Sequence, residues 1–355
     1  MTRALRILAH PAHANRAVNP YQHLLYRALE ERGHTVVEFT PKTALLGRFD
    51  IYHLHWPDAL IDDNPTRHHA LAKAWALRLV VEAQHRRGAR IVWTAHNLQA
   101  HNRRYPDLEA WLWRWLLPRL DGVIYLTEAS RPLLLEARPG LAALPSAVIP
   151  HGHYRGCYRD ELDRRAARTR LGLEPDAEVA VFLGSIGPHK DVDTLLDAFR
   201  GLDRPQARLV LAGRFDDRLR ETAFGRAFLA AVAADPRIRA ELGFVGNDDV
   251  QLYLRAADLF VQSSSLVLNS GSAILALSFD RPVLMRDGPA ATELAATVGT
   301  DWVRGFAPPL TPTALDAALT WATGRPDDVR APLAALDWPA LAAATEAFYA
   351  RLCGG

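Results

Sequence analysis

Cysteine is scarce in this chain: only Cys157 and Cys353 occur among its 355 residues. They form no Cys-x-x-Cys pair, and the sequence shows no signal-peptide pattern, so a reduced cytoplasmic setting is expected rather than a secreted, disulfide-bonded one. Long apolar runs are also missing, since none approaches the roughly 18 residues that a bilayer-spanning helix needs. Any membrane contact is therefore expected to be peripheral, at the inner face of the cell membrane. Internal repeats and low-complexity tracts are absent as well.

The composition is that of a folded chain with more than one domain. Apolar residues make up 49% and charged residues 23%, with a net charge of +2, so intrinsic disorder is not expected. Residues 1–150 hold 19 Lys/Arg against 13 Asp/Glu, and the remainder holds 23 against 27. The basic first half suits an acceptor that carries a diphosphate or a negatively charged membrane surface, and equally an ordinary solvated face. No compact basic-aromatic module is present, so nucleic acid is not an expected partner.

Residues 179–282 contain a succession of buried strands and glycine-rich loops. The apolar run 179–183 predicts a strand buried on both faces of a parallel sheet. The loop 184–190 ends in Lys190, and residues 191–199 have apolar residues at helical spacing. Backbone N–H groups at a glycine turn before a helix attract anions, and a lysine adds a full charge. Phosphate binding is therefore a hypothesis for this loop, although such units also occur in α/β proteins that bind no phosphate.

Further units of the same kind follow. Residues 207–213 and 241–246 each predict a strand ending in glycine, the second followed by an N-cap cluster and a helix over 250–257. A strand is predicted at 258–262, and a small-residue loop then precedes an apolar helix over 273–279. The strand expected at 281–285 completes the series.

In this order the segments resemble the C-terminal domain of GT-B glycosyltransferases related to the sucrose and mannosyl transferases. The matching segments are Phe182-Leu-Gly, Lys190-Asp-Val-Asp-Thr-Leu-Leu-Asp-Ala-Phe199, Leu209-Val-Leu-Ala-Gly213, Phe244-Val-Gly246, Ala257-Asp-Leu-Phe-Val261 and Ala276-Leu-Ser-Phe-Asp-Arg-Pro-Val283. The resemblance implies an α/β, GT-B fold: two Rossmann-like domains with parallel sheets facing a cleft. It assigns residues 1–150 to an acceptor-binding domain, 151–331 to a nucleotide-sugar-binding domain and 332–355 to a helix that packs back on the first domain.

Two departures from that family narrow the expectation. Retaining members usually carry two glutamates eight positions apart, and the corresponding places here are near Val267 and Leu275. The arginine that usually follows the first glycine of the lysine loop is replaced by Ser185 or Gly187. The remaining pattern looks more like bacterial exopolysaccharide glycosyltransferases, including GDP-mannose-dependent β-mannosyltransferases that build lipid-linked repeat units.

This resemblance implies an inverting transfer of mannose from GDP-mannose, a nucleotide-sugar donor, to a glycan or polyprenyl-diphosphate-linked acceptor, without metal or other cofactor. It places the donor-binding residues at Gly184, Ser185, Lys190, Arg214, Val245, Asn269, Ser270, Gly271 and Ser272. Lys190 would stabilise the departing diphosphate, helped by Arg214 or Arg281. A sugar-nucleotide epimerase and a noncatalytic sugar-nucleotide-binding domain of the same fold remain alternatives.

The first half of the chain predicts a second α/β unit. Residues 5–9 and 35–39 predict strands, and between them Asn19 and Pro20 precede a helix over 21–32 that ends before Gly33. This opening is typical of GT-B acceptor domains, although the paired glycines usual in the first loop are absent.

Candidate catalytic residues follow two strands of this half. Residues 50–58 place His53 and His55 on one strand face and Asp58 beyond the strand end, and residues 90–97 end in His96. His53 and His55 form a buried hydrogen-bonded pair or, less readily, part of a zinc site, which would need a third ligand. His96 resembles the histidine that reaches the transferred sugar in related enzymes, with capping of the strand end as the alternative. Asp58 and His96 are the candidates for the base that takes the acceptor proton, with Glu128 as a more remote third.

Three tryptophans lie in a helix expected over 109–120. Trp111 and Trp115 share one face, and Trp113 projects from nearly the opposite face. One face is expected in the core and the other, with Arg114, on a membrane interface. Burial of all three tryptophans is the alternative.

Overall fold

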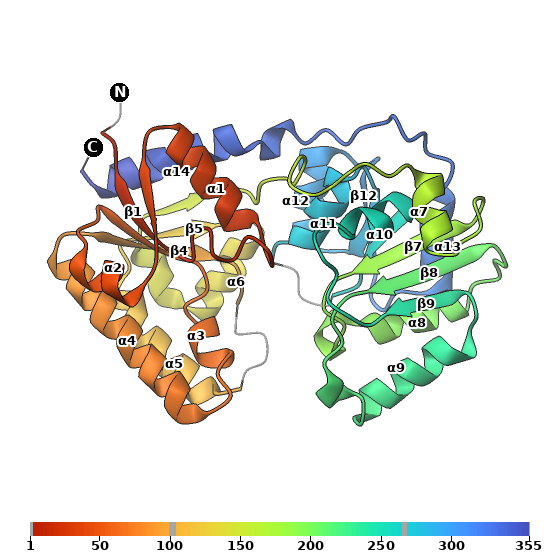
Figure 1. Cartoon of the computed structure of the whole chain (residues 1–355), viewed down its shortest axis with the longest axis horizontal. Helices are drawn as coiled ribbons and strands as arrows, with labels where there is room; N and C mark the ends of the chain where they lie inside the picture. The colour runs from red at the N-terminus through yellow and green to blue at the C-terminus, as the bar shows by residue number, and fades with distance from the viewer. Residues whose placement is uncertain (1–2, 99–103, 265–267, 355) are drawn as a thin grey trace. The chain divides into compact units, whose positions relative to one another are not determined.

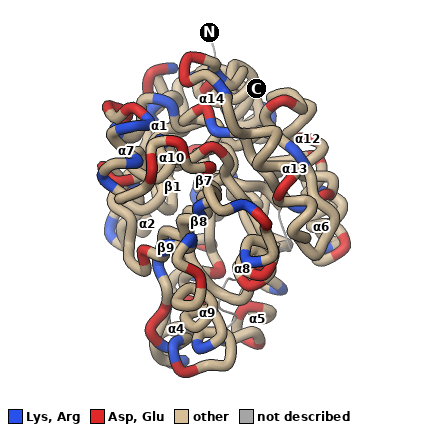
Figure 2. The backbone as a smooth tube through the Cα atoms, turned by 90° about the vertical axis from the view of Figure 1, so that its right-hand side faces the viewer, with Lys and Arg blue, Asp and Glu red and all other residues tan. Residues whose placement is uncertain are grey.

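The computed structural model describes residues 3–98, 104–264 and 268–354 and divides into two compact units (Figure 1). The first unit comprises residues 1–152 and 336–355, and the second comprises residues 153–335. Each contains a six-stranded sheet in which all neighbouring strands are parallel. The predicted α/β class with two parallel sheets is confirmed. Basic and acidic residues are interspersed along both units (Figure 2).

The sheet of the first unit has the strand order β2-β1-β3-β4-β5-β6. Its strands are β1 (Arg6–His10), β2 (Thr35–Glu38), β3 (Ile51–Leu54), β4 (Arg90–Ala95), β5 (Gly122–Tyr125) and β6 (Ser146–Val148). The helices of this unit are α1 (Tyr21–Glu31), α2 (Pro41–Leu46), α3 (Ala59–Asp62), α4 (Arg67–Arg86), α5 (Pro106–Leu116), α6 (Ser130–Ala137) and α14 (Trp338–Leu352). The central strands are buried on both faces, which explains their continuous apolar character.

Helix α14 is part of the first unit, although it lies at the far end of the sequence. Its residues Leu341, Phe348 and Tyr349 share a buried cluster with Leu25 and Leu29 of α1. An ion pair between Arg32 and Glu346 adds a polar link between α1 and α14. The helix begins at Trp338 rather than 332, because residues 334–336 form a separate 3-10 turn before it.

The sheet of the second unit has the strand order β12-β11-β10-β7-β8-β9. Its strands are β7 (Glu178–Leu183), β8 (Ala207–Ala212), β9 (Ile238–Glu241), β10 (Leu259–Gln262), β11 (Val283–Arg286) and β12 (Val303–Phe306). The helices are α7 (Arg164–Arg170), α8 (Val192–Arg200), α9 (Ala223–Ala234), α10 (Val250–Ala256), α11 (Gly271–Ser278), α12 (Pro289–Val298) and α13 (Pro312–Ala322). The strand predicted at 241–246 is wrong in position: β9 pairs with β8 only from Ile238 to Glu241, where β8 also ends.

Candidate active site

Two histidines at the ends of neighbouring strands meet in the first unit. β3 and β4 are parallel neighbours, so the residues that follow them lie at the same edge of the sheet. His55, after β3, and His96, after β4, share a hydrogen bond of 2.9 Å between His55 Nδ1 and His96 Nε2. The other ring nitrogen of His55 lies 2.7 Å from the hydroxyl oxygen of Tyr26 in α1. His96 is 8% exposed and also contacts the ring of Trp56 at a centroid distance of 4.5 Å.

The hydrogen-bond chain continues behind these residues into the core. His53 Nδ1 lies 2.9 Å from the hydroxyl of Tyr26 and 2.7 Å from the hydroxyl of Tyr349, which α14 supplies. His53 Nε2 lies 2.7 Å from Thr94 Oγ1. His53 and His55 are therefore the buried, hydrogen-bonded pair, with their ring nitrogens engaged by neighbouring side chains. Among the residues that the structure describes, no group of three or more His, Cys, Asp or Glu side chains is placed to hold a metal ion.

Burial keeps these histidines neutral near pH 7. It lowers the pKa of His53 to about 3 and the pKa of His96 well below the ordinary value, the latter reinforced by the charges of His151 and His53. A neutral imidazole of such low basicity is a poor proton acceptor, but it orients a hydroxyl well by hydrogen bonding. His96 is thus suited to position a ligand rather than to remove its proton.

Asp58 has the opposite electrostatic character. It follows the β3 end at the start of α3 and is 8% exposed. Burial raises the pKa of its carboxyl group to about 6, with smaller effects from its own backbone hydrogen bond, from Glu109, which raises it, and from Arg138, which lowers it. A carboxylate with this pKa is ionised at pH 7 yet basic enough to accept a proton, as a general base requires.

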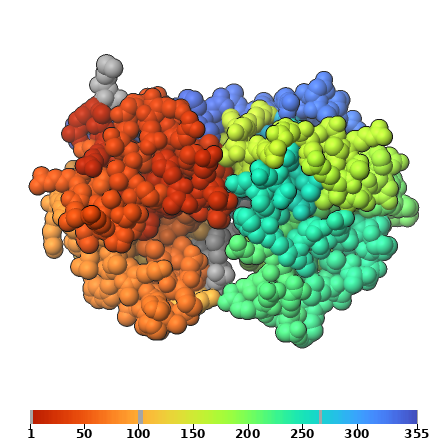
Figure 3. Space-filling view, in the orientation of Figure 1, coloured from red at the N-terminus to blue at the C-terminus, as the bar shows by residue number. Residues whose placement is uncertain are grey.

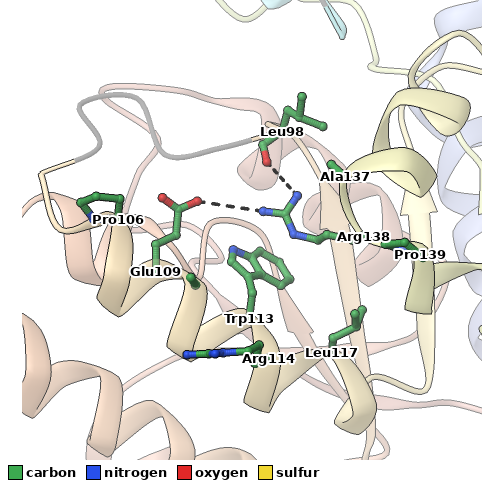
Figure 4. A pocket seen from close by; sticks show the side chains of 10 residues that line it. Leu98, Pro106, Glu109, Trp113, Arg114, Leu117, Ala137, Arg138 and Pro139 are labelled. Carbon is green, nitrogen blue, oxygen red and sulfur yellow. Dashed lines mark hydrogen bonds and ion pairs between the residues drawn. The ribbon is translucent and has the colours of Figure 1, made fainter.

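A pocket of about 380 Å³ lies in the same unit, between α5 and the end of α6 (Figure 4). Arg138 donates a 2.7 Å hydrogen bond to the carbonyl oxygen of Leu98, approaches Glu109 at 4.0 Å and stacks 4.2 Å from the ring of Trp113. The indole N–H of Trp113 is buried and has no hydrogen-bond partner among the residues that the structure describes. Glu109 and Arg138 were not predicted from the sequence as site residues. Glu109 lies in α5 and Arg138 follows α6, and no local sequence pattern shows that these two residues are close in space.

The first loop of this unit holds an internal carboxylate. The backbone N–H groups of Ala12, His13 and Ala14 donate to the carboxylate of Glu38 at 3.1, 2.7 and 2.8 Å. Three amides of the loop after β1 are therefore already engaged. This is the loop in which the usual paired glycines are absent.

In the second unit, the predicted donor-binding residues lie in loops that follow β7, β8, β9 and β10. These four strands are adjacent and parallel, so the loops emerge from one edge of the sheet. The β7 and β8 loops touch: a Cβ atom at Gly213 would lie 1.8 Å from the carbonyl oxygen of Gly184. Ser263, after β10, donates a 2.6 Å hydrogen bond to the carbonyl oxygen of Lys190. The structure thus brings the β7, β8 and β10 loops together.

Lys190 is the candidate cation of this edge. It is half-buried in the 3-10 turn Pro188–Lys190, and burial lowers the pKa of its ammonium group. No carboxylate in the described part of the chain forms an ion pair with it. Ser185, in the same loop, and Arg214, in the loop after β8, are exposed, and the guanidinium group of Arg214 lies 5.6 Å from the centre of the Phe244 ring. An uncompensated, partly desolvated ammonium is a strong site for a phosphate.

The residues Asn269, Ser270, Gly271 and Ser272 lead into α11. Ser270 is the N-cap of that helix, and its Oγ accepts from the backbone N–H of Ala273 at 3.1 Å. Its Oγ also accepts from Gln262 Nε2 at 3.1 Å. The Ser270 side chain is therefore already hydrogen-bonded within the protein, and the backbone N–H groups of the first turn of α11 are the donors that this helix start offers to an anion. Val245, the remaining predicted donor residue, is partly exposed after β9.

Two predictions from the sequence are wrong: the role of Arg281 beside Lys190, and the exposure of Trp113 on a membrane face. Arg281 is 2% exposed and donates to the carbonyl oxygens of Phe279 and Ala257, at the start of β11 rather than at its carboxyl end. It cannot assist Lys190, because the two lie at opposite edges of the sheet. Trp113 is 6% exposed and packs on Trp93 in the core, so it forms no part of a membrane face. Of the two positions that lack glutamate, Leu275 lies in α11 and Val267 lies outside the described residues.

Solved structures with the same arrangement define the class of the fold. The chain superposes on sucrose-phosphate synthase from Thermosynechococcus elongatus with a TM-score of 0.68, covering 99% of each chain at 18% identity. It also superposes on HepE from Anabaena, solved with UDP and glucose, with a TM-score of 0.62, covering 96% and 95% at 17% identity. The fold is that of the GT-B glycosyltransferases.

The sequence comparisons are more specific. Residues 163–321 match the family described as "Glycosyl transferases group 1". The chain is 29% identical over 325 residues to the GDP-mannose:glycolipid 4-beta-D-mannosyltransferase of Xanthomonas campestris pv. campestris, covering 92% of this chain and 86% of the relative. This protein is therefore a glycosyltransferase of the GT-B type, with a group 1 domain in its second half, as the resemblance implied. None of the helices in the described ranges is long and apolar enough to cross a membrane.

Proposed function

We propose that this glycosyltransferase moves mannose from GDP-mannose to a glycolipid acceptor with inversion at the anomeric carbon. The observation that carries the donor half of the proposal is Lys190, a half-buried ammonium without a carboxylate partner in the described residues, at the edge where three loops converge. The choice of donor and acceptor is supported by the mannosyltransferase relative, whose name specifies GDP-mannose, a glycolipid and a β linkage.

In this proposal the second unit binds the donor. Lys190 neutralises charge on the departing GDP, with Arg214 and the backbone N–H groups at the start of α11 as further donors, so that no metal ion is required. Val245, Ser185 and the loop glycines line the nucleotide. The proposal includes the domain assignment made from the sequence: residues 1–150 bind the acceptor, residues 151–331 bind the nucleotide sugar, and residues 332–355 pack back on the first domain.

The first unit binds the acceptor and supplies the base. Asp58 takes the proton of the acceptor hydroxyl as that oxygen attacks the anomeric carbon and the bond to the GDP oxygen breaks. A pKa of about 6 makes Asp58 a better base than His96, whose basicity burial has removed. His96 instead holds the hydroxyl group of a sugar through its ring, which the chain of buried histidines and tyrosines keeps in one orientation.

Donor choice is tested first by thermal shift with GDP, UDP, ADP and dTDP, since only the preferred nucleotide should raise the melting temperature clearly. Turnover with GDP-mannose and a lipid-linked acceptor, with the linkage of the product read by NMR, then tests transfer and inversion. An α-linked product, or a preference for UDP, would overturn the corresponding part of the proposal.

Lys190→Ala tests the role of the cation. Removing one charge-stabilising group costs about 3 kcal/mol, so kcat should fall by at least 100-fold with the fold intact. Lys42→Ala, at an exposed lysine of α2, is the matched control and should leave kcat unchanged. Unchanged turnover in Lys190→Ala would remove the diphosphate role.

A further inference from the structure

Helix α4 exposes a row of large apolar side chains. Leu71, Trp75 and Leu79 are 37%, 48% and 64% exposed and follow one another at intervals of four residues. Because residues four apart lie on the same side of a helix, the three form one continuous strip rather than scattered exposures. Figures 1 and 3 show α4, in orange, along the outside of the first unit. The opposite side of α4 is used in the core, through residues such as Ala74 and Val81.

The strip continues onto α5 through two neighbouring tryptophan rings, which are tilted relative to each other. The rings of Trp75 and Trp111 lie 5.4 Å apart. The guanidinium group of Arg78 stands 4.3 Å from the ring of Trp75 and 4.8 Å from the rings of Trp111 and Trp115. These contacts hold Trp75 in place at the surface and keep a positive charge beside it.

The surroundings of the strip are positively charged. α4 contains four Lys/Arg residues and one acidic residue, Glu82, which is paired with Arg119. Lys73, Arg78 and Arg86 on the helix, and Arg87 directly after it, form no ion pair within the described part of the chain. Arg78 and Arg86 lie on the side of α4 that carries the apolar strip, and Lys73 and Arg87 add positive charge on other sides of the same helix.

We propose that this surface, defined by Leu71, Trp75, Leu79, Arg78 and Trp111, binds the face of a bilayer that contains anionic lipids. Tryptophan and leucine on one helix side, with lysine and arginine beside them, favour insertion at the boundary between headgroups and acyl chains. The cations add attraction to a negative lipid surface, which a second copy of this basic surface would instead repel. A contiguous apolar exposure of this kind is otherwise unfavourable on a monomer in water.

The surface gives the proposed glycolipid transferase a way to reach its acceptor, and in that respect the inference rests on the proposed function. From the sequence, Trp113 of α5 was the tryptophan expected at a membrane interface. In the structure Trp113 is buried, and the exposed tryptophan is Trp75 of α4. Binding is measured without donor or acceptor, so failure of the surface and failure of the transfer reaction remain distinguishable.

The test is flotation of the full chain with vesicles of phosphatidylcholine alone or with phosphatidylglycerol. The wild-type chain should float with the anionic vesicles, and the double variant Trp75→Glu/Leu79→Glu should bind them at least tenfold less. The control Leu133→Glu/Val329→Glu adds the same charge at positions 38% and 41% exposed elsewhere and should bind like wild type. Equal binding by the Trp75→Glu/Leu79→Glu variant, or no binding by the wild-type chain, would overturn the proposal.

Two further measurements keep the result interpretable. Trp75→Phe should retain its melting temperature and lose a component of fluorescence that brominated lipids quench, which shows contact by that ring without adding charge. Light scattering without lipid detects the competing occupant: a wild-type dimer that Trp75→Glu/Leu79→Glu converts to a monomer would identify a contact between copies and refute the lipid surface. Replacing Lys73, Arg86 and Arg87 by glutamine should weaken binding to the vesicles that contain phosphatidylglycerol and leave binding to phosphatidylcholine vesicles unchanged.

Discussion

Asp58→Asn should inactivate this enzyme and at the same time stabilise it at neutral pH. The folded protein holds the pKa of Asp58 at about 6, above the ordinary value of 3.8, chiefly because the carboxyl group is buried. Between these two values the folded protein keeps a proton that the unfolded chain has released. The contribution of Asp58 to the free energy of unfolding is therefore highest below pH 4, falls as the pH rises to about 6, and changes no further above it.

The size of this effect follows from the two pKa values. The gap between 3.8 and about 6 corresponds to roughly 3 kcal/mol, at about 1.4 kcal/mol for each pH unit. Asparagine cannot ionise, so the Asp58→Asn variant does not lose this part of its free energy of unfolding as the pH rises. The free energy of unfolding of wild type minus that of the variant should therefore decrease by up to roughly 3 kcal/mol between pH 4 and pH 7.

Denaturant unfolding followed by tryptophan fluorescence, at several pH values from 4 to 7.5, measures this difference. Asp107→Asn is the control, because Asp107 is exposed and its hydrogen bond with Arg67 lowers the pKa to about 2. Its contribution is lost only as the pH falls below the ordinary value, so the difference between wild type and that variant should be flat over the same range. A difference for Asp58→Asn that is also flat, or that grows with pH, would refute the reasoning.

The raised pKa of Asp58 also leads to a prediction for the pH dependence of the reaction. If Asp58 is the base, kcat/KM of the wild-type enzyme should rise about tenfold for each pH unit below 6 and level off above it. Asp58→Asn should lose at least 100-fold in kcat/KM, within the contribution typical of a general base, about 100- to 10,000-fold. A wild-type profile that is level between pH 5 and 8 would assign the proton to another group.

Three substitutions test the packing that supports the two sites. Gly213→Ala should lower the melting temperature by at least about 5 °C or prevent folding, because its Cβ would lie 1.8 Å from a backbone carbonyl oxygen of the β7 loop, whereas Gly243→Ala, with nothing within 4 Å, should be tolerated. Tyr349→Phe removes a buried hydroxyl 2.7 Å from His53 Nδ1 and should cost about 1 kcal/mol in denaturant unfolding; an unchanged value would show that Tyr26 alone satisfies that nitrogen. Asp258→Ala should cost about 3–5 kcal/mol in the same assay, since it leaves Arg168 buried without its carboxylate; a loss under about 1 kcal/mol would contradict a structural role for this pair.

The sequence by itself determined the α/β class, the parallel sheets and most element positions. Apolar runs such as 179–183 report burial on both faces, and the order of strand, glycine loop and helix leaves few alternatives to a parallel sheet. The loops that carry Lys190 and Ser270 could be placed at one sheet edge for the same reason, since each directly follows a strand. These features depend on local periodicity, which the chain carries in its own order.

Only the tertiary structure decided which side chains meet. Tyr349 reaches His53 across 296 positions, and Arg138, which follows α6, stacks on Trp113 of α5, so neither contact leaves a local signal. Arg281 and Trp113 were misplaced for a related reason: a polar or amphipathic residue in a loop or helix is buried or exposed according to what packs on it. The basicity of Asp58 and His96 was likewise undetermined by the sequence, because desolvation depends on the complete shell of neighbours that the fold assembles.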